Sequence, residues 1–137
     1  MERTRPEIAD WLGKIVALHD DLIFRLGGLP GILDISLLDA ALHRPFTGLA
    51  DGTEHFPDEL DKAAALLEGL IQFHPFADGN KRTASVFVFE FIRECGYELQ
   101  VTEEDVVDVV VKIAIHEMTL VAIRHWLGGI AVKPARE

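Results

Sequence analysis

Cysteine is nearly absent from the 137-residue chain, which has Cys95 as its single example. One thiol excludes an internal disulfide and fits a reducing compartment. Basic residues are also few, because 13 Lys and Arg stand against 23 Asp and Glu and give a formal charge of −10. This balance argues against direct binding of nucleic acid or anionic lipid over the whole surface. Any phosphate must then be bound by a local group of residues.

Long apolar runs are missing as well. No segment reaches the roughly 18 uninterrupted apolar residues of a membrane span, and the first residues, MERTRPEIADWLGK, lack the apolar core of a signal peptide. We therefore expect a cytoplasmic protein that does not bind a membrane. With 49% apolar and 26% charged residues the composition is that of a globular protein. The length fits a single domain over residues 1–137.

Apolar residues recur at three- and four-residue spacing over most of the chain, which predicts an all-α fold. The expected helices cover residues 8–26, about 36–42, about 57–73, 80–96, 102–117 and about 119–127. Gly27-Gly28, Gly96 and Gly128-Gly129 are read as helix ends. The fourth segment is apolar almost all round, so we expect it to be the central helix.

Helix starts are indicated by hydroxyl and acidic side chains. Ser36 followed by Asp39 resembles a capping box, and Thr102 followed by three acidic residues predicts a helix start. Between the second and third helices the chain is irregular, and Asp51-Gly52 is expected to close a small hairpin through a type I′ turn. The tail IAVKPARE, residues 130–137, is expected to fray.

One ten-residue stretch, HPFADGNKRT from His74 to Thr83, holds a base, a carboxylate, a glycine, an amide and two cations. It lies where the loop after the third helix enters the fourth. Unpaired N–H groups and the positive end of the dipole make a helix N-terminus favourable for anions. Lys81 and Arg82 in the first turn oppose that dipole. They make sense there if a bound phosphate supplies negative charge, so we expect a phosphate site.

Asp78 and His74 complete this candidate site. A carboxylate beside substrate phosphates is a usual way for proteins to hold Mg²⁺, and a neutral imidazole can take a proton from a hydroxyl near neutral pH. Gly79 lets a ligand approach the backbone closely. Taken one at a time, these residues also have ordinary structural interpretations. His74 could be a surface histidine, Asp78-Gly79 a turn, Asn80 an N-cap, and Lys81 with Arg82 a solvated basic face. At one loop-to-helix junction, they predict a Mg-nucleotide site with a general base.

The letters GNKRT do not form a P-loop. That motif needs a second glycine five residues before the Gly-Lys pair, Lys directly after Gly, and a preceding strand. Here position 74 is His, Asn80 intervenes, and a helix precedes. Pro75 and Phe76 are expected to anchor the loop in the core. The other histidines follow no ligand spacing and are expected to be structural or at the surface: His19, His43, His55, His116 and His125.

The stretch HPFADGNKRTA resembles the motif of the Fic/Doc family, which runs His-Pro-Phe-x-Asp/Glu-Gly-Asn-x-Arg. Lys after Asn is similar to the death-on-curing (Doc) branch. The likeness extends to GGLPGILDISLLDAAL, residues 27–42, and covers most of residues 8–127. It implies an all-α bundle of about six helices, with a central helix hairpin around the motif. It also implies a small flap, residues 45–57, that docks the backbone of the target.

The resemblance further implies transfer of part of a nucleotide to a protein hydroxyl, with ATP and Mg²⁺ as cofactors. His74 would be the base and Asp78 the magnesium ligand. The other motif residues would bind the nucleotide phosphates: Gly79 and Asn80 as an anion cradle, with Lys81 and Arg82 balancing charge and Arg82 holding the distal phosphates.

Two departures separate the chain from adenylylating members of that family, which have Gly in place of Lys81 and Arg in place of Ser85. Lys81 would crowd the α-phosphate pocket, and the missing Arg removes a γ-phosphate clamp. Doc toxins share both departures; they resemble kinases and transfer the γ-phosphate to a Thr of the translation factor EF-Tu. The sequence also lacks the family's inhibitory Ser/Thr-x-x-x-Glu-Gly/Asn motif, so restraint would come from a separate antitoxin.

The expected function is therefore that of a Doc-like toxin, a protein kinase for a Thr or Ser of a translation factor that arrests protein synthesis. Two alternatives remain open. One is AMP transfer to a protein hydroxyl, and the other is a non-catalytic module that binds an antitoxin.

Overall fold

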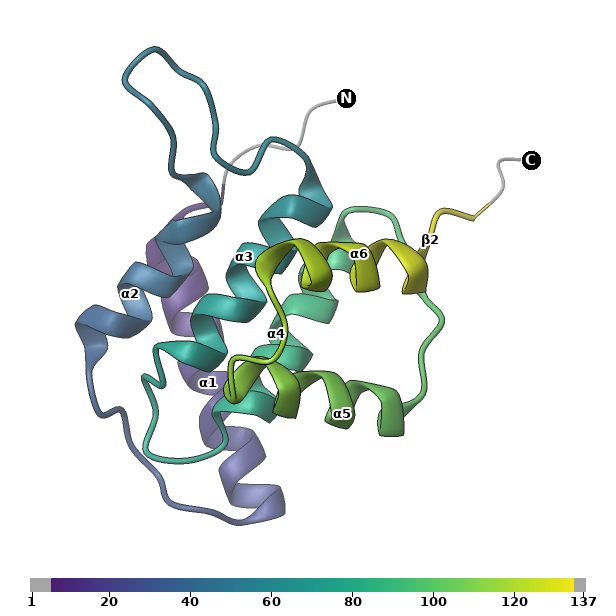
Figure 1. Ribbon diagram of the computed structural model, residues 1–137. Helices are drawn as coiled ribbons and strands as arrows, with labels where there is room; N and C mark the ends of the chain where they lie inside the picture. The colour runs from purple at the N-terminus through teal and green to yellow at the C-terminus, as the bar shows by residue number, and fades with distance from the viewer. Residues whose placement is uncertain (1–5, 135–137) are drawn as a thin grey trace.

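The computed structural model describes residues 6–134, so both ends of the expected 1–137 domain lie outside the described residues (Figure 1). Its architecture is all-α, as the sequence predicts. Six helices follow one another: α1 (Ile8–Leu26), α2 (Ile35–His43), α3 (Glu59–Gln72), α4 (Asn80–Glu94), α5 (Glu103–Ala114) and α6 (Leu120–Ile130). The 3-10 helix η1 (Arg44–Phe46) continues α2, and the short strands β1 (Glu98–Leu99) and β2 (Ala131–Val132) pair antiparallel.

Side-chain caps set most of the helix starts. Thr102 caps α5 as predicted, because its hydroxyl accepts the backbone N–H of Asp105. The capping box expected at Ser36 is wrong, since Asp34 is the N-cap of α2 and its carboxylate accepts the N–H groups of Ser36 and Leu37. Asp34 has the extended backbone that an N-cap needs, whereas Ser36 already lies inside the helix.

The core is centred on α3, in which nine of 14 residues are buried. The expectation that the fourth helix is apolar almost all round, and hence the central one, is wrong: α4 exposes Lys81, Arg82, Glu90, Arg93 and Glu94 along one side. Its other side packs against α3 to form the helix hairpin around the motif loop. Small residues give α3 its central place, because Ala63, Ala64 and Ala65 let neighbouring helices approach closely.

The last helix does not end at Gly128-Gly129. α6 runs on to Ile130, which is buried in the core. Packing of that side chain outweighs the helix-breaking tendency of two glycines, roughly 1 kcal/mol each. The expected fraying of the tail from residue 130 is also wrong for Ala131 and Val132, which pair with β1, whereas residues 135–137 lie outside the described part.

A hairpin joins η1 to α3 through the bridge Gly48–Glu54. The type I′ turn expected there is wrong, because only Gly52 has a positive φ (92°) and Asp51 does not. The N–H of Gly52 bonds the carbonyl of Leu49, which makes a type I turn followed by a glycine bulge. Figure 1 shows the hairpin projecting beyond the start of α3, at the opposite end of that helix from the loop that leads into α4. Among residues 6–134, no helix is long and apolar enough to cross a membrane.

Candidate functional site

The motif loop between α3 and α4 is closed by the side chain of Asn80. Its Oδ1 accepts the backbone N–H of Phe76 at 2.9 Å, and its Nδ2 donates to the carbonyl of Phe76 at 2.9 Å. Pro75 and Phe76 are buried, which confirms that they anchor the loop. The Asn80 carboxamide is buried and points into the loop, so the residue offers a ligand its backbone N–H rather than its side chain.

His74 lies exposed at the start of this loop in a left-handed backbone conformation, with φ 51°. Such a conformation is uncommon for a residue with a Cβ and is enriched at functional sites. Its Nδ1 lies 3.2 Å from Nδ2 of Asn80. The two bonds to Phe76 fix the orientation of the Asn80 amide, so a hydrogen faces the ring and His74 Nδ1 is the acceptor.

Asp78 is exposed, and its carboxylate is held by backbone N–H groups. Leu29 donates to Oδ2 at 3.1 Å, and Gly79 donates to Oδ1 at 2.9 Å. The bonds from Leu29 and Gly79, with smaller contributions from Lys81 and His19, hold the pKa of the Asp78 carboxyl below its usual value. The Asp78 carboxylate is therefore ionised at neutral pH and can act as an oxygen ligand for a metal ion.

His19 of α1 supports the loop from beneath. The ring is 1% exposed, stacks on Phe76 with centroids 3.9 Å apart, and has Nε2 2.8 Å from the carbonyl of Asp78. Because a carbonyl only accepts, Nε2 carries the proton. Nδ1 is then buried without a hydrogen-bond partner, 3.8 Å from a carboxylate oxygen of Asp20. An unmade buried bond of this kind costs about 1–3 kcal/mol, so the stack and the bond to Asp78 must outweigh it.

A second loop, between α1 and α2, is joined to the motif loop by backbone hydrogen bonds. Leu33 donates to the carbonyl of Pro75 at 2.8 Å, and Ala77 donates to that of Gly31 at 3.0 Å. Gly28 lies so close that a Cβ there would stand 2.8 Å from Oδ2 of Asp78. The backbone of residues 28–33 is thus part of the structure that positions Asp78.

The N-terminus of α4 has the features of an anion site. Gly79 is its N-cap, with φ 75° and no side chain to cap the free N–H groups, whereas α2, α3, α5 and α6 all have side-chain caps. Lys81 and Arg82 project from the first turn into solvent, and neither forms an ion pair within residues 6–134. Uncapped N–H groups and two unpaired cations together favour a phosphate here.

A cavity of about 440 Å³ begins at this helix end and runs between α4 and α5. Its polar end is formed by the motif residues from Asp78 to Arg82 and by Ser85. Apart from Glu103 at the start of α5, its other walls are apolar: Val86, Phe89, Val106, Val107, Val110 and Val111. Phosphates at the helix end and a flat apolar base against these walls would suit a cavity of this size.

Mg²⁺ fits the site only together with a phosphate ligand. No cluster of three or more His, Cys, Asp or Glu able to hold a metal occurs between residues 6 and 134. Asp78 supplies one ionised carboxylate, and Mg²⁺ commonly takes one or two carboxylates with phosphate and water oxygens for the rest. The donor set present therefore suits Mg-nucleotide and not a free cation.

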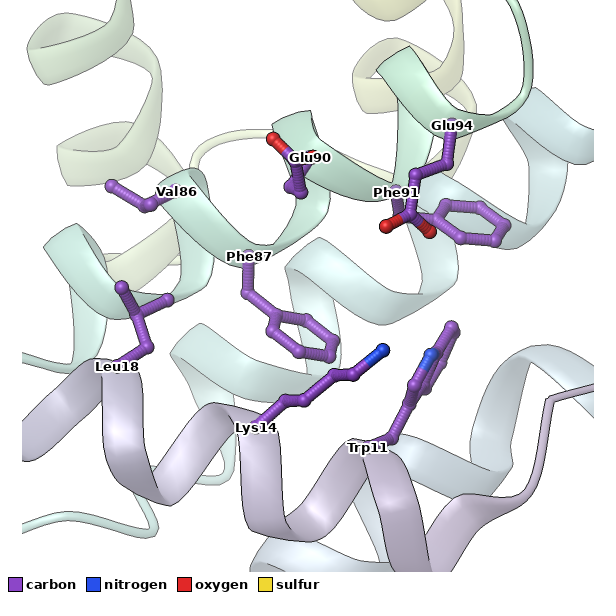
Figure 2. A pocket seen from close by; sticks show the side chains of 8 residues that line it. All are labelled: Trp11, Lys14, Leu18, Val86, Phe87, Glu90, Phe91 and Glu94. Carbon is purple, nitrogen blue, oxygen red and sulfur yellow. The ribbon is translucent and has the colours of Figure 1, made fainter.

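A separate groove of about 310 Å³ lies on another face, between α1 and α4 (Figure 2). Trp11, Phe87 and Phe91 contribute aromatic rings to its lining, and Lys14 and Glu90 contribute charged side chains. It contains no motif residue and is not part of the candidate site.

The structure brings the expected residues His74, Asp78 and Asn80 together in one loop, with Lys81 and Arg82 in the following turn. The expected flap does not join them, since the hairpin lies at the other end of α3 (Figure 1). Sequence reasoning missed the roles of His19 and Leu29. A signal for His19 was present, because it falls on the buried stripe of α1 with Ile8, Trp11 and Ile15.

Comparison with known proteins agrees with the motif. A family model described as Fic/DOC family matches residues 12–92, more than half of the chain. Toxin Doc of Mycolicibacterium smegmatis is 42% identical over 73 residues, which make up 53% of this chain and 55% of that protein. Protein kinase doc of Escherichia phage P1 is 35% identical over 86 residues, 63% of this chain and 67% of that protein.

The chain spans about half the length of the first of these relatives and two thirds of the second. The matched range contains α3, the motif loop and nearly all of α4. The chain therefore belongs to the Fic/DOC family, and the relatives that it matches are Doc proteins.

Proposed function

We propose that this protein is a Doc-like toxin that transfers the γ-phosphate of ATP to a Thr or Ser hydroxyl of a translation factor such as EF-Tu, and so arrests protein synthesis. One observation carries the proposal. The ionised carboxylate of Asp78 and the uncapped, cationic start of α4 line one end of a cavity of about 440 Å³, and the exposed imidazole of His74 lies beside them, with Nδ1 3.2 Å from Nδ2 of Asn80.

In this mechanism the protein mainly positions charge, which is what phosphoryl transfer requires. The α4 N–H groups with Lys81 and Arg82 would hold the phosphates, and Asp78 would hold Mg²⁺, which neutralises phosphate charge when bound. His74 would accept the proton of the attacking hydroxyl. Asn80 would keep the loop closed around its bonds to Phe76.

A separate antitoxin would restrain the activity, because the sequence has no inhibitory motif of its own. The names of the two relatives, a toxin and a protein kinase, favour this proposal over a non-catalytic module. Calorimetric titration with Mg-ATP separates the two, since a module that only binds an antitoxin needs no nucleotide.

Labelled ATP tests the reaction directly. The protein is incubated with purified bacterial EF-Tu and ATP labelled at either the α or the γ phosphate. Label from the γ position alone supports phosphate transfer, and label from the α position would mean AMP transfer instead. Lys81→Gly probes the same choice, because Lys81 occupies the position of the glycine in adenylylating relatives.

His74→Ala and Asp78→Ala are expected to abolish transfer and growth arrest without unfolding the chain, since both side chains are exposed. His125→Ala on α6 and Asp108→Ala on α5 are matched controls, since both residues are exposed and neither belongs to the motif loop or lines the cavity. Growth arrest that persists in both motif variants would rule the mechanism out.

A further inference from the structure

The cavity between α4 and α5 has one charged wall residue that the proposed mechanism does not use. Among the described residues that line it, Glu103 is the only charged side chain outside the motif. Glu103 is the first residue of α5 and is exposed. Its carboxylate forms no hydrogen bond or ion pair with any other residue between 6 and 134. A carboxylate without a partner on the wall of a cavity is available to a ligand group that donates hydrogen bonds.

Glu103 lies at the end of the cavity that is far from the phosphate site. Gln72, just before the motif loop, donates its side-chain amide to the carbonyl of Ile113 at 3.2 Å, which places the end of α5 beside that loop. Glu103 precedes Ile113 by ten residues, so it lies about 15 Å away along the helix axis, at about 1.5 Å per residue. Figure 1 shows α5 beginning on the side of the molecule away from the loop that leads into α4.

This position puts Glu103 next to the nucleoside end of a bound nucleotide. The phosphates would be held at the start of α4, and the carboxylate of Glu103 would repel them. Beyond Ser85 the other walls carry only valine and phenylalanine side chains, against which a flat base can pack. None of these side chains can form a hydrogen bond. Glu103 is therefore the side chain on the cavity wall that can read the edge of the base.

The four bases offer a carboxylate different partners, because an ionised carboxylate only accepts hydrogen bonds. Guanine presents two adjacent donors, N1–H and the 2-amino group, which can bond both carboxylate oxygens at once. Adenine presents its 6-amino group beside an unprotonated N1, which repels the second oxygen. Cytosine has the same pattern of donor beside acceptor, and uracil has a single N–H between two carbonyls. A carboxylate at this place therefore favours guanine.

We propose that Glu103 selects the base of the bound nucleotide, and that the cavity binds GTP at least as tightly as ATP. The selecting contact is a pair of hydrogen bonds from the guanine N1–H and 2-amino group to the two oxygens of the Glu103 carboxylate. This inference rests on the proposed function, because it concerns the nucleotide of that same transfer. It adds the class of base that the cavity prefers and the residue responsible for the preference.

Calorimetric titration of the purified protein with Mg-GTP and Mg-ATP measures the preference. Wild type is expected to bind GTP with a Kd no higher than that for ATP. Glu103→Gln should shift the ratio of the two Kd values toward ATP by about fivefold, because the glutamine amide can accept from the adenine 6-amino group and donate to N1. The same amide offers guanine one acceptor in place of two. Mg-ITP, whose base lacks the 2-amino group, should bind wild type more weakly than Mg-GTP.

Glu104→Gln is the matched control, because Glu104 is the next residue in the first turn of α5, is also exposed and does not line the cavity. Each variant removes one negative charge from the positive end of the helix dipole, so thermal unfolding should change by a similar, small amount in both. The lost charge strengthens the binding of both nucleotides alike and leaves their ratio unchanged. In Glu104→Gln the ratio should stay within about twofold of wild type. Equal shifts in both variants, or none in Glu103→Gln, would overturn the proposal.

Base selection and phosphate transfer can fail separately, because binding is measured without an acceptor. If neither form of labelled ATP marks EF-Tu, yet the ratio of Kd values responds to Glu103→Gln as expected, the proposed function fails and the base selection stands. If the γ label is transferred but wild type binds ATP more tightly than GTP, the proposed function stands and the base selection is wrong. A protein that binds neither nucleotide would contradict both.

Discussion

Asn80 determines which nitrogen of His74 carries the proton. Its Nδ2 lies 3.2 Å from His74 Nδ1 and can only donate, so the neutral imidazole accepts at Nδ1 and bears its hydrogen on Nε2. A base that acts through Nε2 needs the opposite tautomer. In the proposed reaction the contact with Asn80 must therefore open, either for Nδ1 to take the hydroxyl proton itself or for the ring proton to move to Nδ1 so that Nε2 can take it.

Asn80→Asp is expected to reverse this tautomer, because a carboxylate accepts from Nδ1–H where the amide donated to Nδ1. One oxygen of the new side chain can still accept the N–H of Phe76, although the bond to the Phe76 carbonyl is lost. Nitrogen-15 NMR of the His74 ring should place the hydrogen on Nε2 in wild type and on Nδ1 in the variant. Identical ring spectra would show that Asn80 does not set the tautomer.

His19→Phe should separate binding from stability. Phenylalanine can keep the stack on Phe76 but loses the bond to the Asp78 carbonyl, and it also removes the unpartnered Nδ1. We expect the free energy of unfolding to change by no more than about 1 kcal/mol and the affinity for Mg-ATP to fall roughly tenfold. His19→Gln, which can place an amide donor near the same carbonyl, should retain more affinity. Urea unfolding and calorimetry measure the two effects, and equal affinities for both variants would contradict this role.

Gly28→Ala tests the close approach to Asp78. A Cβ at position 28 would stand 2.8 Å from Oδ2, so the carboxylate must move and the affinity for Mg-ATP should fall. Gly31→Ala is a matched control, because Gly31 has a similar φ, 108° against 119°, but its Cβ would meet nothing within 4 Å. Both variants should lose roughly 1 kcal/mol of stability from backbone strain. Only Gly28→Ala should weaken nucleotide binding in calorimetry, and equal weakening in both would argue against the contact.

Acid should remove the contribution of Asp78 to stability. Its pKa is lowered in the folded state, chiefly by the N–H groups of Leu29 and Gly79, so the stabilisation is present above the unfolded value of about 3.9 and is lost as the pH falls through the lower folded value. The difference in unfolding free energy between wild type and Asp78→Asn should therefore shrink as the pH falls below about 4. Chemical denaturation between pH 7 and pH 3 measures it. A difference that stays constant over this range would be evidence against the two backbone bonds.

Much of the fold follows from the local sequence pattern. Where the predictions from that pattern are wrong, the structure gives a physical cause. The apolar spacing of α1 predicts Ile8 and Leu26 as its ends, because period and glycine stop agree there. At α2 two capping residues stand two positions apart, and only the extended backbone of Asp34 decides between them. At α6 burial of Ile130 overrides the glycine pair, which no local rule describes.

The candidate site also contains some residues that the sequence predicts and others that only the folded structure brings to it. His74 and Asp78 are four residues apart in one motif, so their chemistry is legible in the sequence. His19 and Leu29 lie 59 and 49 residues from Asp78 along the chain, and only the packing of α1 beneath the motif loop brings them to it. The position of the hairpin, by contrast, follows from chain order, since the hairpin directly precedes α3 and the motif loop directly follows it, so the helix holds the two apart.

The length of α3 determines how long a bound peptide must be to contact both the hairpin and the motif loop. Its 14 residues measure about 21 Å at a rise of about 1.5 Å per residue, and they separate the hairpin from the motif loop. An extended peptide advances about 3.3 Å per residue, so one shorter than about six residues cannot reach both ends. A short synthetic peptide that carries the acceptor threonine can thus report on the His74 end alone, and only a longer or folded acceptor can reveal whether the hairpin adds anything.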